Sequence, residues 1–262
     1  MLLPASRYLA IFALVPIFLH GFSQAGPRKD SPSASTPVFL ELFTSEGCSS
    51  CPPADKLLAD LDRTQPIPGA NLIVLSEHVD YWNGEGWSDP YSSPAFTARQ
   101  EMYASRLDVS EIYTPQLVVD GARSVVGSNW PKVKKAVEES LNNPKVSVSV
   151  VAERSKGTEN GALIQVSLGA APAQPRARVF LVVARDRAQS QVARGENAGR
   201  SLSHVAVAYL MREIGATSPE TRPDVSVPVS LLPKSHSGDT RVIVFAQEPR
   251  TGKVIGVAQT CF

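Results

Sequence analysis

Two cysteines in a C-x-x-C spacing, Cys48 and Cys51, stand between an apolar run and a helical pattern, and this arrangement most constrains the fold. Residues 38–43 are typical of a buried strand, and the apolar residues of 54–61 recur at helical spacing. Thiols at a turn from strand to helix lie near the positive end of the helix dipole, which favours the thiolate. Such a pair either closes a disulfide or binds a soft metal ion, so the motif predicts a reactive site.

Residues 1–25 are interpreted as an export signal. The apolar run at 8–19 follows a positive charge and is shorter than a membrane-spanning helix, and the small residues Ser23 and Ala25 stand where a signal peptidase reads. An uncleaved membrane anchor is the alternative. Residues 26–37, rich in proline, serine and alanine, are predicted to be a flexible tether. The sequence therefore predicts a periplasmic or secreted protein.

Charge and cysteine content narrow the possible partners. The formal net charge of +1 gives no electrostatic argument for nucleic acid or acidic membranes. We therefore expect no nucleic-acid partner and no membrane contact beyond the export signal. Three cysteines are too few for disulfide bonds to stabilise a chain of 262 residues as a scaffold, so Cys48 and Cys51 are interpreted as a reactive site. The third, Cys261, is an adventitious thiol, a bridge in a dimer or a third redox partner.

Apolar runs and breakers predict the order of elements in the first half. Strands are expected at 38–43, 71–79, 116–120 and 124–126, and helices at 53–63, 93–107 and through 133–141. Two consecutive prolines, Pro52 and Pro53, indicate either that the first helix is kinked there or that its regular part begins at Pro52. This order, β-α-β-α-β-β-α with C-x-x-C after the first strand, is that of a thioredoxin-like domain.

The second half alternates between apolar and polar residues. Strands are expected at 145–152, 163–168, 179–184, 225–229 and 241–246, with one helix at 203–214. Short strands of this kind favour a β-sandwich. The predicted fold is therefore an α/β thioredoxin-like domain over 38–143, followed by a smaller, mostly-β sandwich-like domain over 144–262.

Five stretches together form a specific pattern: 41–55, 78–82, 93–100, 113–116 and 195–200. Through them the chain resembles a family of secreted, thioredoxin-like proteins known only as a domain of unknown function. In thioredoxin-like proteins a cis-proline opens the third strand and lies against the C-x-x-C, and Pro115 stands at that position. The resemblance therefore implies a cis Thr114–Pro115 bond beside the cysteines, and it implies a fold rather than an activity.

The two cysteines have different predicted roles. Cys48, at the exposed start of the turn, is expected to attack, and Cys51, at the entry of the helix, to resolve the intermediate. The hydroxyls of Ser49 and Ser50 are placed to donate hydrogen bonds to a thiolate, which would make the disulfide more oxidising. His78 follows the second strand, and adjacent parallel strands share a rim at their carboxyl ends. It is expected beside Cys48 as a general base, a thiolate partner or a metal ligand, or else bonded to the following loop.

Aromatic and charged residues are expected around this site. Trp82, Trp87 and Thr114 are predicted to contact a substrate, although aromatic rings in a loop also form local cores. Glu196 lies in a glycine-bearing loop that either leans over the cysteines or forms solvated ion pairs of its own. The isolated His204 is interpreted as a surface residue.

Three functional hypotheses follow. In the first, an exported thiol–disulfide oxidoreductase without a cofactor acts on disulfides or thiols of proteins or small molecules. Cys48 forms a mixed disulfide, Cys51 resolves it to a Cys48–Cys51 disulfide, and Pro115 presents a backbone edge to the substrate. In the second, Cys48, Cys51 and His78 hold Cu(I) in a copper chaperone. In the third, the chain is a non-catalytic binding module. The oligomeric state does not follow from the sequence.

Overall fold

A computed structural model describes residues 35–155, 161–169, 176–217, 224–230 and 238–262. The predicted export signal at 1–25 and nearly all of the predicted tether at 26–37 lie outside these residues. The chain from 34 to 262 forms one compact unit. None of the helices in the described part is long and apolar enough to cross a membrane.

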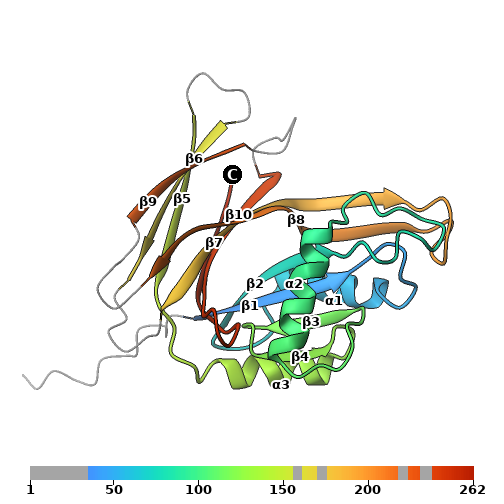
Figure 1. The fold of residues 1–262 in the computed structure, drawn as a ribbon, viewed down its shortest axis with the longest axis horizontal. Coiled ribbons are helices and arrows are strands. Elements are labelled where there is room, and N and C mark those ends of the chain that lie inside the picture. Colours follow the sequence, from blue (N-terminus) through green and yellow to red (C-terminus); the bar gives the residue numbers. More distant parts are fainter. Residues whose placement is uncertain (1–34, 156–160, 170–175, 218–223, 231–237) are drawn as a thin grey trace, which may run out of the picture. The chain divides into compact units, whose positions relative to one another are not determined.

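The elements of the first half alternate between strands and helices (Figure 1). They are β1 (Thr36–Thr44), α1 (Pro52–Thr64), β2 (Ala70–His78), α2 (Pro94–Arg106), β3 (Gln116–Val119), β4 (Arg123–Val126) and α3 (Trp130–Ser140). In its described part, the second half of the chain consists of strands joined by loops and turns. They are β5 (Val148–Arg154), β6 (Gly161–Leu168), β7 (Ala177–Gln191), β8 (Ser201–Thr217), β9 (Asp224–Ser230), β10 (Thr240–Gln247) and β11 (Val254–Cys261).

The predicted fold class, a thioredoxin-like α/β domain followed by a sandwich-like domain, is wrong. The described chain is mostly β, with a mixed eight-stranded sheet in the order β11-β10-β7-β8-β2-β1-β3-β4 and a three-stranded sheet in the order β5-β6-β9. The long sheet runs through both halves because β8 pairs in parallel with β2 at Ser76 and Val207. The Ser76 hydroxyl also donates a 2.8 Å hydrogen bond to the Val205 carbonyl. Strands from the second half therefore extend the sheet that the first half begins.

The helix predicted at 203–214 is also wrong, because this segment lies in β8. Alanine, leucine, methionine and arginine give the segment its helical character, but β7 and β8 form a long antiparallel hairpin with pairs from Gln191–Ser201 to Ala177–Thr217. Gly195 and Gly199, both at positive φ, allow the tight turn between them. Tertiary pairing has overridden local helix propensity here.

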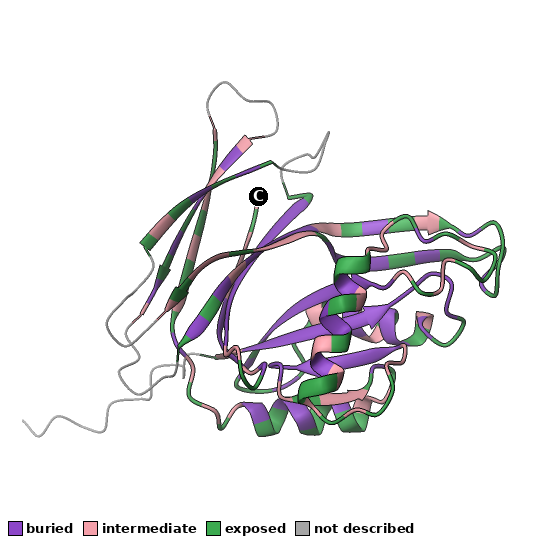
Figure 2. Ribbon diagram, viewed as in Figure 1, coloured by how far each residue is buried: buried purple, intermediate pink, exposed green. Residues whose placement is uncertain are grey.

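Most residues of β1, β2 and β10 in the long sheet are buried (Figure 2), and most of these buried residues are apolar. One face packs against α1 and α3 through residues such as Leu40, Leu58 and Val133. Phe96 of α2 packs on the opposite face. The three-stranded sheet packs against β7 and β10 through a separate cluster that includes Ile164. The helices and the small sheet thus hold the long sheet rigid on both sides.

A buried carboxylate joins the two halves. Asp120 Oδ1 accepts a 2.9 Å hydrogen bond from the Phe39 amide of β1. Its second oxygen forms a 2.6 Å ion pair with Lys145, and its own carbonyl accepts from the Val254 amide of β11 at 2.8 Å. Because Asp120 contacts the beginning and the end of the chain, its loss would leave buried donors unpaired in both halves.

Candidate functional site

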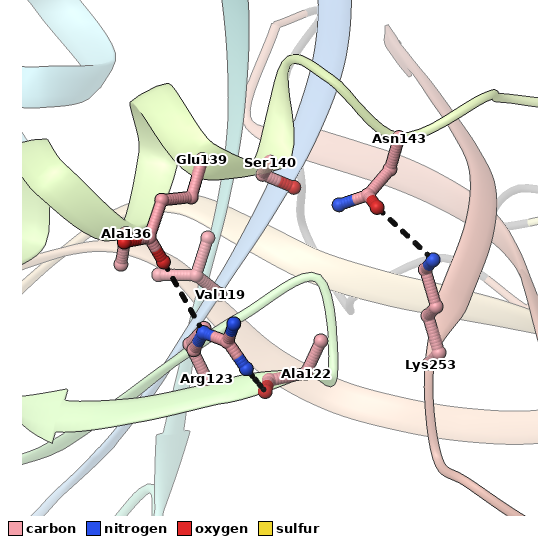
Figure 3. A pocket seen from close by; sticks show the side chains of 8 residues that line it. All are labelled: Val119, Ala122, Arg123, Ala136, Glu139, Ser140, Asn143 and Lys253. Carbon is pink, nitrogen blue, oxygen red and sulfur yellow. Dashed lines mark hydrogen bonds and ion pairs between the residues drawn. The ribbon is translucent and has the colours of Figure 1, made fainter.

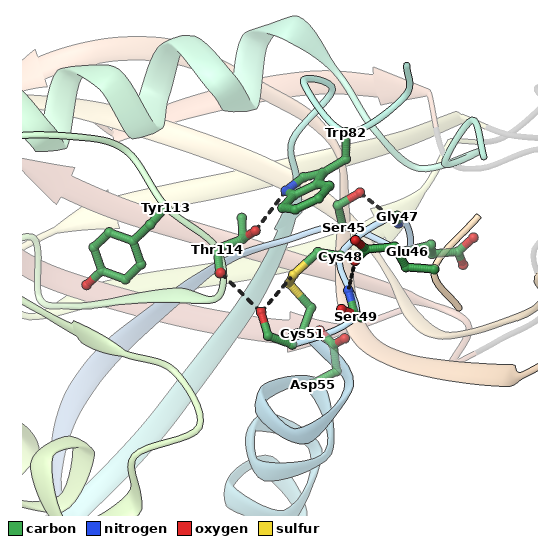
Figure 4. The surroundings of a disulfide bond; sticks show 12 residues. Ser45, Glu46, Gly47, Cys48, Ser49, Cys51, Asp55, Trp82, Tyr113 and Thr114 are labelled. Atoms are coloured by element: carbon green, nitrogen blue, oxygen red, sulfur yellow. Dashed lines mark hydrogen bonds between the residues drawn. A yellow bond between two sulfur atoms is a disulfide. The ribbon is translucent and has the colours of Figure 1, made fainter. Parts of the chain in front are cut away.

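The C-x-x-C pair lies where β1 gives way to α1, and the structure closes a disulfide between Cys48 and Cys51 (Figure 4). Cys51 is the N-cap residue of α1, and the helix begins at Pro52, which is the second of the two alternatives that the prolines leave. Both cysteines are completely buried, so the expectation that Cys48 is exposed is wrong. The disulfide therefore lies at the positive end of a helix but beneath a cover of neighbouring residues.

One serine of the motif contacts the cysteine sulfur. The Ser50 hydroxyl lies 3.3 Å from Cys48 Sγ, and it also lies 3.4 Å from the Thr114 carbonyl oxygen, to which it donates. Ser50 thus connects the cysteine turn to the loop before β3. Because a hydroxyl carries one proton, donation to a Cys48 thiolate once the disulfide opens would replace the bond to Thr114. The sequence predicts such donation for both serines, and Ser50 is the one that lies beside the sulfur.

The loop before β3 has the predicted cis bond between Thr114 and Pro115. The Thr114 hydroxyl accepts a 2.8 Å hydrogen bond from the indole nitrogen of Trp82. A side chain added at Gly47 would come within 2.9 Å of Trp82 Cβ, so the backbone end of Trp82 lies directly against the residue that precedes Cys48. Trp82 and Thr114 are therefore beside the disulfide, as Figure 4 shows.

The loop between β7 and β8 reaches the cysteines from the second half of the chain. The Asn197 side-chain amide donates to the carbonyl oxygens of Glu46 at 2.8 Å and Cys48 at 2.9 Å. The Glu196 carboxylate accepts from the Ser49 amide at 3.1 Å, and this contact lowers the Glu196 pKa. Of the two predictions for this loop, the one in which it leans over the cysteines is confirmed. The site is therefore built from both halves of the sheet.

A buried ionic cluster lies next to the motif. His204 of β8 is 3.3 Å from Glu46 Oε1 through Nε2 and 3.8 Å from Asp55 Oδ2 through Nδ1. Burial acts to lower the His204 pKa, but the hydrogen bonds and charges of Asp55 and Glu46 outweigh burial and raise it to about 10. Burial likewise acts to raise the Glu46 pKa, yet its hydrogen bonds, that from His204 foremost, bring it below the usual value. His204 is thus a buried imidazolium paired with carboxylates at neutral pH.

His78 lies in a second buried pair behind this cluster. Its Nδ1 is 2.7 Å from Asp89 Oδ2, and its ring meets the His204 ring edge-on at a centroid distance of 4.6 Å. In the described part of the chain it has no hydrogen bond to either cysteine. Burial acts to raise the Asp89 pKa, but the charge and hydrogen bond of His78 lower it below the usual value. His78 therefore bonds to the loop that follows it, which is the second of its two sequence interpretations.

The remaining predicted residues occupy different places. Trp87 donates from its indole nitrogen to Glu46 Oε2 at 2.8 Å, so it supports the ionic cluster. Cys261 is exposed at the end of β11. Among the residues that the structure describes, no three histidine, cysteine, aspartate or glutamate side chains converge as a metal site. The ligand set of Cys48, Cys51 and His78 is therefore not assembled.

The sequence matches one family over most of its length. A family model described as "Protein of unknown function (DUF1223)" matches residues 39–247. The chain belongs to this family. No curated protein matches it significantly.

Two solved structures share the fold of this DUF1223 protein. The X-ray crystal structure of protein AGR_C_4864 from Agrobacterium tumefaciens is 24% identical, covers 85% of this chain and 92% of its own, and has a TM-score of 0.66. HBP35 of Porphyromonas gingivalis is 13% identical, with 88% and 76% covered and a TM-score of 0.59. At these identities the likeness concerns the fold alone.

Sequence reasoning assigned no role to Glu46 and Asp55 of the ionic cluster and placed His204 on the surface. Glu46 immediately precedes Gly47 of the motif, and a carboxylate so close to a C-x-x-C was a usable signal. Asp55, one turn into α1, was another. His204 gave no such signal, because the segment was expected to be helical. Its prediction as a surface residue is wrong, since the side chain is completely buried.

Apart from the cysteine site, the structure has a concavity of about 270 Å³ between α3 and the β3–β4 turn (Figure 3). Its charged groups have partners within the concavity: Arg123 contacts Glu139 at 3.3 Å, and Lys253 donates to the amide oxygen of Asn143 at 3.2 Å. Such paired surface groups contribute little binding energy. The cysteine site is therefore the better candidate for chemistry.

Proposed function

We propose that this DUF1223 protein is an exported thiol–disulfide oxidoreductase whose redox centre is Cys48 and Cys51. The observation that carries the proposal is a disulfide at the N-terminus of α1 with a hydroxyl 3.3 Å from the Cys48 sulfur. Helix N-termini and hydroxyl donors both stabilise thiolates, and a stabilised thiolate leaves readily from a disulfide. A purely structural link across so few residues would constrain the unfolded chain little.

The reaction transfers two electrons from a dithiol to a disulfide. The Cys48 thiolate attacks one sulfur of a substrate disulfide, and the other substrate sulfur leaves as a thiolate. The Cys51 thiolate then attacks Cys48 Sγ in the mixed disulfide, and the second substrate sulfur leaves. The protein is oxidised to the Cys48–Cys51 disulfide and the substrate is reduced to a dithiol; the reverse sequence oxidises a substrate.

Access to the sulfurs requires local movement. Both cysteines are completely buried, whereas Ser49 and Ser50 between them are exposed. Trp82 lies against Gly47, and Asn197 holds the Cys48 carbonyl. A protein disulfide reaches Cys48 only when these contacts give way, whereas a small thiol needs a smaller opening. We therefore expect slow exchange with folded proteins and faster exchange with small thiols or extended segments.

The test is a redox titration of the full chain carrying Cys261→Ser, which removes the exposed third thiol. The protein is equilibrated in graded glutathione buffers, and its thiols are counted by the mass added on alkylation. A reversible two-electron transition supports the proposal. A disulfide that stays closed throughout points to a structural link and overturns it.

Trapping supplies the second measurement. Cys51→Ser leaves the Cys48 thiolate able to attack a substrate disulfide, but no second thiol resolves the product, so mixed disulfides with disulfide-containing substrates should accumulate. Cys48→Ser in the same background is the matched control and should trap far less. Equal trapping by the two variants would contradict the assigned order of attack.

A further inference from the structure

The strand β8 loses its neighbour half-way along. Its first half lies beside β2, and the two strands pair at Ser76 and Val207. β2 ends at His78, whereas β8 continues to Thr217 and there pairs only with β7 among the described strands. The segment 209–217 therefore presents one free sheet edge, with backbone donors and acceptors that have no strand partner on that side.

This free edge lies across a groove from α2, the helix drawn in front of β2 in Figure 1. The groove encloses about 500 Å³ and is lined by Ala95, Ala98 and Met102 of α2 and by Tyr209, Leu210 and Met211 of β8. Tyr209 is 60% exposed, an unusual value for a large ring on an open edge. Proteins normally protect such edges with charge, proline or a covering element. An edge that no other strand of the described chain pairs with, beside an apolar helix face, is typical of a surface that receives another strand.

Positive charge marks both ends of the groove. At one end it opens into a hollow of about 470 Å³ that contains Arg185, and at the other into a smaller one that contains Arg106 and Arg178. Arg185 and Arg106 have no carboxylate partner among the described residues, whereas Arg178 pairs with Glu213 at 3.6 Å. Five arginines and one acidic residue line the groove: Arg99, Arg106, Arg178, Arg185, Arg212 and Glu213. Because Arg99 pairs with Glu41 and Arg212 donates to the Pro228 carbonyl, the charge available to a ligand is that of Arg185 and Arg106 at the two ends.

We propose that this groove binds an extended peptide segment of a partner protein, with apolar residues in its middle and acidic residues at its ends. The peptide would add a strand to the free edge of β8, its backbone bonding to 209–217. Its apolar side chains would lie between Tyr209 and α2. Its acidic ends would meet Arg185 and Arg106.

Two other occupants fit the groove less well. If a second copy of this chain paired with it edge to edge, the arginine-lined grooves of the two copies would face each other. The repulsion between like charges makes this arrangement electrostatically unfavourable. A lipid tail would fill the apolar middle but would leave the backbone donors and acceptors of β8 without partners. The peptide uses the backbone edge, the apolar middle and the charged ends together.

The probe is a short acetylated peptide in which valine and serine alternate between aspartates at both ends, labelled for fluorescence anisotropy with the full chain. Saturable binding is expected. Replacing the terminal aspartates by lysine should weaken it, and N-methylation of two alternate amides should weaken it about thirtyfold, because each lost hydrogen bond costs about 1 kcal/mol. Neither change matters if binding is a non-specific apolar contact.

Two variants locate the site. Ala98→Trp fills the groove from an exposed helix position and should abolish binding, whereas Glu101→Trp, exposed on the same helix outside the groove, should leave it unchanged. No saturation up to about 1 mM, a concentration at which even millimolar affinity is measurable, overturns the proposal. So does equal binding by the N-methylated peptide, or a dimer that Ala98→Trp dissociates.

Because neither cysteine contributes to the groove, the double variant Cys48→Ser/Cys51→Ser should bind the peptide unchanged. The failure of this proposal is therefore distinguishable from the failure of the redox proposal.

Discussion

Asn197 donates a 2.9 Å hydrogen bond from its side-chain amide to the carbonyl oxygen of Cys48, and so links the hairpin of the second half to the C-x-x-C. The same amide donates to the Glu46 carbonyl at 2.8 Å, and Asn197 is completely buried. The backbone on both sides of Gly47 is therefore held by one side chain.

We expect Asn197→Ala to destabilise the protein by about 2 kcal/mol, because two buried carbonyls lose their donor. Reduction of the disulfide by dithiothreitol should also become faster, since the cysteine turn is freed. Urea unfolding and alkylation kinetics measure the two effects. Glu196→Ala is the matched control, because Glu196 is exposed and contacts the same turn. A variant of Asn197 as stable as that control would contradict the role given to the amide.

The His204 cluster predicts a particular dependence of stability on pH. The pKa of His204 is about 10 in the folded protein, against about 6.5 in the unfolded chain. The folded state therefore binds the extra proton between these values, so the stabilisation is complete below about pH 6.5 and is lost as the pH rises towards 10. Comparing wild type with His204→Gln, the difference in unfolding free energy should shrink by on the order of 2 kcal/mol over this range.

Matched urea titrations at several pH values check this, since other groups that titrate near pH 10 are common to both proteins. A difference between wild type and His204→Gln that stays constant from pH 6.5 to pH 10 would show that the imidazolium is not what the cluster stabilises.

Local sequence patterns predicted much of the motif and its neighbours. The helix start at Pro52, the cis bond at Pro115 and the closeness of Trp82 and Thr114 to the cysteines all depend on short-range chemistry or on the family pattern. Periodicity also located most strands of the second half. These features need no knowledge of which distant strands pair.

Long-range pairing was beyond the sequence. Nothing in the pattern around Ser76 shows that β8 lies beside it. This one pairing joins strands from the two expected domains in one eight-stranded sheet. The same pairing carries His204 into the site beside Glu46. An isolated histidine in a segment of mixed propensity gives no sign of burial, so the ionic cluster was visible only in three dimensions.

A second buried ionic cluster should dominate the stability of the first half. Arg99 of α2 lies 2.5 Å from Glu41 of β1, and the Tyr103 hydroxyl donates to the same carboxylate at 2.5 Å. We expect Arg99→Met to cost about 3–5 kcal/mol in urea unfolding, because it leaves a buried carboxylate unpaired. The double variant Arg99→Met/Glu41→Gln should recover part of the loss. If the double variant is less stable than Arg99→Met alone, the charge of Glu41 is not the cause.

Gly47 provides the sharpest test of the cover over the disulfide. A Cβ at this position would lie 2.9 Å from Trp82 Cβ and 3.3 Å from the Trp82 carbonyl oxygen, so Gly47→Ala must push Trp82 away and break its hydrogen bond to Thr114. We expect a loss of about 1–3 kcal/mol in stability from this overpacking. Disulfide reduction by a small thiol should become faster at the same time.

Gly84→Ala is the matched control. Gly84 lies in the same loop as Trp82 but has open space around the new methyl group, so this change should alter neither quantity. If Gly47→Ala lowers stability yet leaves the reduction rate at the control value, Trp82 does not limit access to the disulfide.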